Sequence, residues 1–357
     1  MPEEGRKTPD IVDRNDSPTS KFRIALDLMG GDVREAALEG CLEALAQGIN
    51  VVPVGDEASI ENLKARATKV PGLTLEDVDF IVSKSVISPS DAPVRAIRGK
   101  PDSSIVLGLT AVKEGRAHAF VSAGSTGALV AGGVLILGRA EGVEKPGLGT
   151  VLPSSAGRGV FFIDLGASVD CRPENIVEFA VMGHVYASAV LGWSNPPVAL
   201  LNVGVEQEKG NLLSRKAFEL LSRAPINFQG NIEARDVFAL DGGVVVCDGF
   251  TGNVFLKTCE GTAFFQLQTI KREVTRDLRS KLGALLLKPA FSRVRKILDY
   301  TEYGGAPLLG LSGTVIKCHG SSGGKAIANG IRAALRCVEE DVTGKIGRAL
   351  QARAGTR

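Results

Sequence analysis

Residues 22–32 read FRIALDLMGGD, a short apolar run that ends in a turn with two consecutive glycines. The run predicts a first strand over Phe22–Leu26. A helical stretch follows over about Arg34–Gln47, and a second β-branched run covers Ile49–Val54. Alternation of short strands and helices is typical of a parallel, doubly wound α/β sheet.

The same alternation continues through most of the chain. Further strands are expected at Ala119–Ser122, Gly159–Asp164, Val198–Asn202 and Val244–Cys247, and helices at Ser104–Glu114, Asn175–Leu191, Leu212–Ser222 and Gly324–Val338. We therefore expect one largely parallel, doubly wound α/β domain over residues 22–338, with a polar, disordered extension before it (1–21) and a polar tail after it (339–357). Ligands bind beyond the carboxyl ends of strands in such sheets, so the turns that follow the strands are where chemistry is expected.

The composition is that of a soluble globular protein, 44% hydrophobic and 23% charged. The six cysteines are scattered without a C-x-x-C pair, which indicates reduced thiols and a cytoplasmic protein. The three histidines have no metal-ligand spacing, and no apolar run reaches the roughly 20 residues of a membrane-spanning helix. We expect no metal, no cofactor and no nucleic-acid partner.

The first candidate turn is DLMGGD, at residues 27–32. Gly30 and Gly31 allow a ligand to approach the backbone closely, and Asp27 precedes them. The turn lacks the G-x-G-x-x-G order of a dinucleotide-binding loop. Taken alone, it is better explained as a tight turn that needs glycine.

The second candidate turn is SAGSTGAL, at residues 122–129. Ser122, Ser125 and Thr126 offer hydroxyl groups, and Gly124 exposes its backbone N–H where a helix begins. This combination can hold an anion such as phosphate or a carboxylate. The alternative is ordinary capping of the helix by Ser125 or Thr126, which uses the same N–H groups.

Later turns add candidates that could meet an anion or take part in proton transfer. Lys209, Asp248 and Asn253 lie in Gly- and Asn-rich stretches that follow predicted strands. His319 and Ser321 stand in HGSSGGKA, where the histidine could act as an acid, a base or an oxyanion donor. The alternatives are a solvated lysine, a structural histidine and a simple helix entry.

A basic, amphipathic helical pattern covers residues 261–298. Lys271–Lys296 holds nine basic and two acidic residues, a net charge of +7 in a chain whose total is +2. Pro289 is expected to end one helix and start another. The residues expected to contact an acidic carrier or an anionic membrane are Arg272, Arg276, Leu282, Leu285, Leu286 and Phe291. The alternative is a hairpin packed on the body or on a dimer partner.

The order of the motifs resembles one family. LDLMGGD, KPDSSI, FVSAGSTGAL, DLGASVDCRPE, LLNVGVEQEKG, FQGNIEARD, DGFTGNVFLKT, EYGGAPLLG and HGSS follow one another between Arg23 and Val338. Together they are similar to the phosphate acyltransferases of bacterial phospholipid synthesis, the PlsX family. The resemblance departs at Ser125 and Ser168, where the family usually has asparagine.

The resemblance implies an enzyme that moves a fatty acyl group from acyl carrier protein to inorganic phosphate. It also implies a homodimer, peripheral membrane attachment, a downstream acyl-phosphate:glycerol-3-phosphate acyltransferase, and a fold similar to phosphotransacetylases and isocitrate/isopropylmalate dehydrogenase-like enzymes. Carried over by motif, Lys209 is expected to neutralise phosphate, and Asn253 to orient phosphate or the thioester carbonyl. The alternatives are a phosphotransacetylase-like enzyme that uses acyl-coenzyme A, a nicotinamide-dependent dehydrogenase, and a non-catalytic membrane-surface scaffold.

Overall fold

The computed structural model describes residues 21–298 and 304–354, so the predicted N-terminal extension lies, except for Lys21, outside the described residues. The strands are β1 (Arg23–Asp27), β2 (Asn50–Gly55), β3 (Ile81–Val82), β4 (Ala119–Ser122), β5 (Gly147–Leu152), β6 (Val160–Ile163), β7 (Val198–Asn202), β8 (Phe228–Glu233), β9 (Val244–Val246), β10 (Ala306–Leu309) and β11 (Thr314–Lys317).

The α-helices are α1 (Arg34–Ala46), α2 (Glu57–Ala67), α3 (Pro93–Gly99), α4 (Ser104–Lys113), α5 (Thr126–Gly132), α6 (Pro173–Ala189), α7 (Leu212–Leu221), α8 (Gly249–Val274), α9 (Leu278–Leu298), α10 (Gly324–Glu339) and α11 (Val342–Ala354). A π-helical turn, η1 (Gly133–Leu137), continues α5, and a 3₁₀ turn, η2 (Ala234–Ala239), follows β8.

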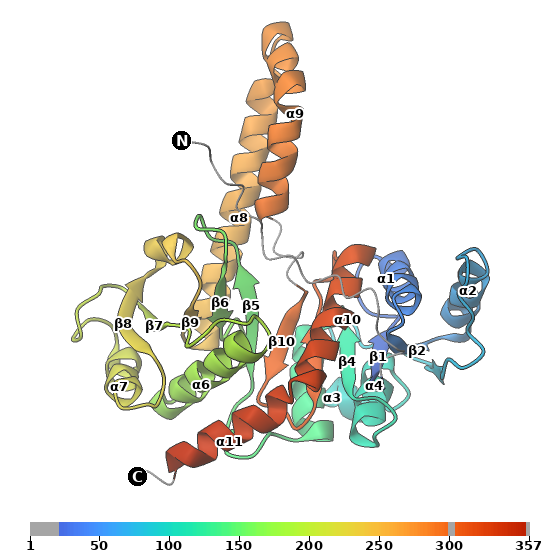
Figure 1. Ribbon diagram of the computed structural model, residues 1–357, viewed down its shortest axis with the longest axis horizontal. Coiled ribbons are helices and arrows are strands. Elements are labelled where there is room, and N and C mark those ends of the chain that lie inside the picture. Colours follow the sequence, from blue (N-terminus) through green and yellow to red (C-terminus); the bar gives the residue numbers. More distant parts are fainter. Residues whose placement is uncertain (1–20, 299–303, 355–357) are drawn as a thin grey trace.

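The described strands form one sheet in the order β3-β2-β1-β4-β11-β10-β5-β6-β9-β7-β8 (Figure 1). At one end of the sheet, neighbouring strands are parallel in the order β3, β2, β1, β4 and β11. At the other end, neighbouring strands are parallel in the order β6, β9, β7 and β8. β10 and β5 join the two ends through antiparallel pairings with β11, with each other and with β6. The prediction of a largely parallel sheet is confirmed, and the antiparallel junction of β5 and β10 was not predicted.

Helices cover both faces of the sheet. In β1, Ile24 and Leu26 pack against the α1 and α10 side, whereas Ala25 packs with Ile105 and Leu109 of α4 on the other. β6 repeats this pattern, because alternate residues of a strand point to opposite faces and its residues divide between two cores. Strands buried on both faces read as continuous apolar runs, which is why these strands were visible in the sequence.

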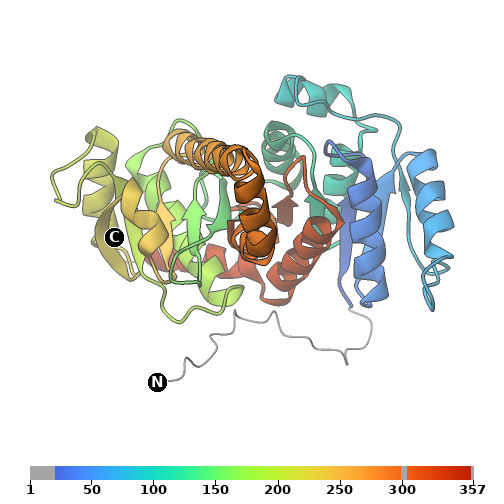
Figure 2. The same ribbon diagram turned by 90° about the horizontal axis from the view of Figure 1, so that it is seen from above.

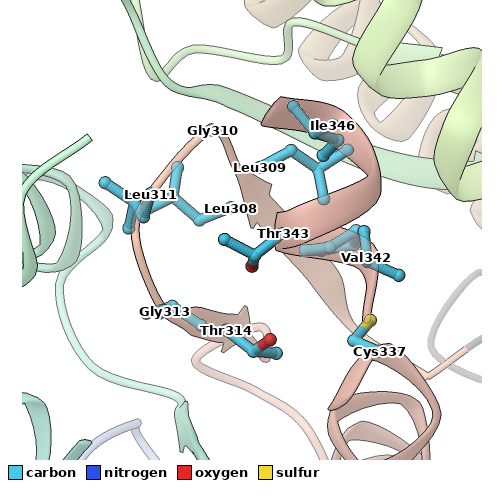
Figure 3. A pocket seen from close by; sticks show the side chains of 12 residues that line it. Leu308, Leu309, Gly310, Leu311, Gly313, Thr314, Cys337, Val342, Thr343 and Ile346 are labelled. Atoms are coloured by element: carbon cyan, nitrogen blue, oxygen red, sulfur yellow. The ribbon is translucent and has the colours of Figure 1, made fainter. Parts of the chain in front are cut away.

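The C-terminal segment expected to be a polar tail is instead the helix α11. Val342, Ile346 and Leu350, spaced four residues apart on one face, are buried in the main core. A pocket of about 10 Å³ lies between this helix and the β10–β11 region, and Figure 3 shows side chains that line it, including Leu308, Cys337 and Ile346. A pocket of that size holds at most a single water molecule, so α11 is closely packed against the domain.

Helices α8 and α9 form a hairpin that projects away from the body, above the middle of the sheet (Figures 1 and 2). The break falls at Thr275–Asp277, where the Asp277 carboxylate caps α9 by accepting from Ser280 N at 2.8 Å. The expectation that Pro289 separates two helices is wrong, since α9 runs through it. Proline removes one helical hydrogen bond, and Leu285, whose carbonyl loses its partner, is exposed to water.

The hairpin keeps most of its apolar side chains exposed. Leu286 is 83% exposed and Leu285 66%, and Phe264 and Phe265 on α8 are 64% and 68% exposed. Packing of this hairpin on the body of its own chain is therefore excluded for these side chains. Of the helices in the described ranges, none combines the length and the apolar character needed to cross a lipid bilayer.

Candidate active site

A cavity of about 750 Å³ lies where the two ends of the sheet meet. One side is formed by the turns that follow β1, β4 and β11, at Met29–Asp32, Ala123–Gly127 and Cys318–Gly320. The other side is formed by the turn after β6 and by the first turns of α8, and β5 and β10 lie between them. A cavity of this size is typical of a small-molecule or cofactor site.

Asp27, the last residue of β1, joins two of these turns. Its Oδ1 accepts from the N–H groups of Met29 (2.9 Å) and Gly30 (3.0 Å), and its Oδ2 accepts from the Ser122 hydroxyl (2.7 Å). Ser122 Oγ in turn accepts from Gly124 N at 2.9 Å. Burial raises the pKa of Asp27, against the lowering effect of these hydrogen bonds. Asp27 and Ser122 are buried beneath the cavity wall, where they hold the two turns together.

Gly30 is required by this close packing. A Cβ atom at Gly30 would lie 2.6 Å from Asp27 Oδ2 and 2.6 Å from the backbone nitrogen of Gly124. Heavy atoms do not approach so closely without displacement, so a larger residue would separate the turns. The tight-turn explanation of DLMGGD is confirmed, and Gly30 and Gly31 also line the cavity, where close approach of a ligand to their backbone stays a prediction.

The SAGSTGAL turn presents backbone and hydroxyl groups to the cavity. Gly124, Ser125 and Thr126 all line it. Ser125 is also the N-cap of α5, with its hydroxyl accepting from Ala128 N at 3.4 Å. The capping interpretation of Ser125 is therefore correct, and it does not remove the residue from the cavity wall.

Asn253 lies on the opposite wall. Asn253 was expected in a strand-end loop, but it belongs to the second turn of α8. Asp248 is the N-cap of this helix and accepts from Thr251 N (2.9 Å) and Thr251 Oγ1 (2.7 Å), outside the cavity lining. Within the described part of the chain, no hydrogen bond occupies the Asn253 side-chain amide, so its donors and acceptor remain available to a ligand.

Gly166 brings the turn after β6 against Asn253. Its φ of +125° lies in the region that favours glycine, and a Cβ there would stand 3.4 Å from Asn253 Cγ. This same turn is built on the buried carboxylate of Asp164. That side chain accepts from the N–H groups of Leu148, Gly166, Ala167 and Ser168 at 2.7–3.0 Å.

Asp164 therefore fixes the turn after β6 by accepting from its backbone N–H groups, as Asp27 fixes the turn after β1. Burial raises the pKa of Asp164 to about 6, and its four N–H donors act in the opposite direction. Ser168, one of the two departures from the family pattern, donates its hydroxyl to Pro146 O at 2.9 Å and is buried. Its side chain contributes to the loop and is not on the cavity wall.

His319 lies in the turn after β11, at a strand end as predicted. It lines the cavity and is exposed, and its Nδ1 is 2.8 Å from the hydroxyl of Ser321, which is not in the cavity lining. Burial lowers the pKa of His319, and the nearby charge of Lys317 lowers it further. Lys317, the last residue of β11, also lines the cavity and was not proposed from the sequence.

Lys209 lies apart from this cavity. It is exposed, on the loop that follows β7, and it is absent from the cavity lining. Its backbone carbonyl accepts from Asn202 Nδ2 at 3.1 Å, which fixes the loop near the end of its strand. The structure thus brings Gly30, Gly31, Gly124, Ser125, Thr126, Asn253 and His319 to one cavity, and leaves Lys209, Asp248 and Ser321 outside its lining.

Part of the cavity wall is apolar. Ile87, Pro89, Leu148, Leu165 and Leu256 line it, from the segment before α3, from β5, from the turn after β6 and from α8. The cavity therefore has groups suited to an anion in the turns after β1, β4 and β11, and an apolar surface suited to a hydrocarbon group.

Solved structures share the fold of this chain. A phosphotransacetylase from Streptococcus pyogenes aligns over 90% of this chain and 95% of its own, with a TM-score of 0.58 and 17% identity. The EutD phosphotransacetylase from Staphylococcus aureus aligns over the same shares, with a TM-score of 0.57 and 16% identity. At such identities the likeness shows the fold alone, and this fold agrees with the phosphotransacetylase-like fold that was predicted.

Residues 22–345 match the family model described as fatty acid synthesis protein. The phosphate acyltransferase of Brevibacillus brevis is 46% identical over 92% of this chain and 98% of its own, and that of Caldicellulosiruptor saccharolyticus is 48% identical over 90% and 96%. The chain belongs to the PlsX family of phosphate acyltransferases, and it is an acyltransferase enzyme.

Proposed function

We propose that this enzyme transfers a fatty acyl group from the thioester of acyl carrier protein to inorganic phosphate, giving an acyl phosphate for phospholipid synthesis. The observation that carries the proposal is one cavity with both surfaces that this reaction needs. Glycine and hydroxyl-bearing turns after β1 and β4 suit a phosphate, and the apolar wall around Leu148, Leu165 and Leu256 suits an acyl chain. Family membership supports the same reaction.

The chemistry is a single acyl transfer. An oxygen of phosphate forms a bond to the thioester carbonyl carbon, the C–S bond breaks, and the electron pair leaves on the sulfur of the carrier. In this proposal the Asn253 amide donates to the carbonyl oxygen as it gains charge, and the enzyme acts by holding the two reactants in place. The phosphate-neutralising role predicted for Lys209 stays a prediction. His319, which lines the cavity, is the candidate for proton transfer.

The direct test uses pure protein, acyl carrier thioester and phosphate. We expect acyl phosphate and free carrier thiol to appear in equal amounts, and neither to appear without phosphate. Thiol release without acyl phosphate would mean that water is the acceptor, and the proposal would fail. The fold shared with phosphotransacetylases favours a second candidate donor, acyl-coenzyme A. A kcat/KM for acyl-coenzyme A above that for the carrier thioester would select it.

The hairpin is proposed to attach the enzyme to the inner face of the cytoplasmic membrane. Its exposed leucines could enter the acyl boundary of a bilayer while basic residues face anionic headgroups. Arg272 and Arg276 are more than 70% exposed and pair only with Glu273 among the described residues, and such surface pairs bind weakly. A long-chain acyl phosphate would then pass directly to a membrane-bound acyl-phosphate:glycerol-3-phosphate acyltransferase.

Substitution of Leu285 or Leu286 by Glu should weaken vesicle binding. Burying a leucine is worth about 2 kcal/mol, so each variant should partition roughly 10- to 100-fold less onto anionic vesicles. Flotation of wild type, Leu285→Glu and Leu286→Glu measures this. Val82→Glu, at an exposed apolar site on β3, is the matched control. Wild type that ignores anionic vesicles, or variants that float equally well, would rule out this anchor.

The exposed aromatic side chains of α8 are proposed to form a homodimer interface. Phe264 and Phe265 are adjacent, strongly exposed aromatic residues on α8, and a monomer rarely leaves such groups in water. Light scattering at micromolar protein should report a mass about twice the 37.4 kDa of one chain, and Phe265→Asp should lower it. A stable monomer of the wild type under these conditions would contradict the proposal.

A further inference from the structure

Lys317 is a charged residue in the cavity wall. It is the last residue of β11 and lies beside Ser122, the last residue of β4, in the parallel register of the two strands. Its Nζ donates to the backbone carbonyl of Ala123 at 3.2 Å and to that of Cys318. The ammonium group is therefore held between the turn after β4 and the turn after β11, and it faces the cavity.

The positive charge of Lys317 is not neutralised at short range. Among the described residues no carboxylate lies within ion-pair distance of its Nζ, whereas Lys257 on the same cavity pairs with Glu260 at 2.8 Å. The nearby carboxylate of Asp27 is already occupied by two backbone N–H groups and the Ser122 hydroxyl. A partly buried cation without a counter-ion is costly, and a bound anion removes that cost.

The donor geometry also leaves room for a ligand. A lysine ammonium carries three N–H donors, and two of them are directed at the carbonyls of Ala123 and Cys318. Burial lowers the pKa of Lys317, while the charges of Asp32 and Asp27 act to raise it. These two carboxylates help to keep the ammonium form without taking its third donor.

We infer that Lys317 binds the acceptor phosphate of the acyl transfer. Its third N–H donates to a phosphate oxygen, and its charge offsets the negative charge that phosphate brings into the cavity. Gly30, Gly124 and Thr126 line the cavity on the same side, so the phosphate would rest between these turns and face Asn253 across the cavity. This inference rests on the proposed function, and it assigns the cation of the phosphate site to Lys317 rather than to Lys209.

The test measures phosphate binding directly. Inorganic phosphate is titrated into wild type and Lys317→Met by calorimetry, with no acyl donor present. Loss of a hydrogen bond to a charged group should weaken phosphate binding by about 10- to 100-fold. Lys113→Met, at an exposed site on the last turn of α4, should bind phosphate as the wild type does. Equal phosphate affinity in wild type and Lys317→Met would overturn the inference.

Stability separates a binding role from a structural one. Methionine keeps most of the apolar stem and removes the buried charge, which favours the fold, but it leaves the carbonyls of Ala123 and Cys318 without their donor, which opposes it. The melting temperature without phosphate therefore does not assign the role, and the shift that phosphate produces does. Phosphate should raise the melting temperature of wild type and not of the variant. A variant that melts earlier yet gains the same stabilisation from phosphate would make Lys317 structural only. If Lys317→Met does not fold, Lys317→Gln, which keeps an amide donor for the carbonyls, decides in the same assays.

Kinetics connect the site to the reaction. The KM for phosphate should rise in Lys317→Met while the KM for the acyl thioester stays near its wild-type value. The two proposals can fail separately. Wild type that binds phosphate through Lys317 but forms no acyl phosphate would refute the proposed function and leave the anion site standing. Acyl phosphate formation with an unchanged KM for phosphate in the variant would refute the role of Lys317 and leave the proposed function standing.

Discussion

Asn253→Ala should lower kcat by about 100-fold or more. In the proposed reaction the Asn253 amide donates to an oxygen that gains charge in the transition state, and the loss of one such donor costs on the order of 3 kcal/mol. The fold should stay intact, because the side chain is exposed to the cavity and holds no hydrogen bond within the described residues. Steady-state kinetics with saturating phosphate and acyl carrier thioester measure the effect.

Two variants sharpen this test. Asn62→Ala removes an exposed amide on α2 that bonds only to Arg66 among the described residues, and it should leave kcat unchanged. Gly166→Ala places a methyl group about 3.4 Å from Asn253 Cγ in a backbone region that favours glycine. It should reduce kcat without removing the amide. Full activity of Asn253→Ala would take Asn253 out of the reaction.

The sequence predicted best the elements that are buried on both faces. The bounds of β4 and β7 match the predicted Ala119–Ser122 and Val198–Asn202, because both strands are apolar runs that end in a polar residue. The junction strands β5 and β10 were missed. They read GLGTVL and APLL, and glycine and proline obscure the strand pattern there.

Two missed features had a signal in the sequence. In α11, Val342, Ile346 and Leu350 recur every four residues, which is a helical face in a segment that is polar overall. The hairpin break at Asp277 is followed three residues later by Ser280, whose N–H it caps. The prediction placed the break at Pro289 and did not consider this cap, although an exposed helix can tolerate proline when water replaces the lost hydrogen bond.

The turns that form the candidate site were predictable from the sequence, but which charged side chains line its cavity was not. Glycine and hydroxyl groups at strand ends mark a place for an anion, and five such residues meet at the cavity. Sequence could not show that Lys317 points inward or that Lys209 lies on a separate loop, because both are lysines near strand ends. Their difference comes from the packing of β11 beside β4 in the middle of the sheet, and no local pattern records it.

Asp164→Ala should destabilise the protein by at least about 3 kcal/mol. The Asp164 carboxylate accepts from four backbone N–H groups, which would be left buried without a partner, and each unsatisfied donor costs about 1–3 kcal/mol. The turn that holds Gly166 against Asn253 should loosen as well, so kcat should fall with stability. Urea unfolding gives the free energy, and Asp170→Ala, at an exposed site six residues away, is the control.

The pH dependence distinguishes Asp164 from an ordinary surface carboxylate. Burial raises its pKa from 3.8 to about 6, so the folded protein binds this proton more tightly than the unfolded chain does. Its contribution to stability is greatest below about pH 4 and declines by about 3 kcal/mol as the pH rises through about 6. Asp164→Asn does not titrate, so the stability lead of wild type over this variant should shrink across that range. A constant difference between them from pH 4 to 7 would show that the carboxyl does not titrate from a buried state.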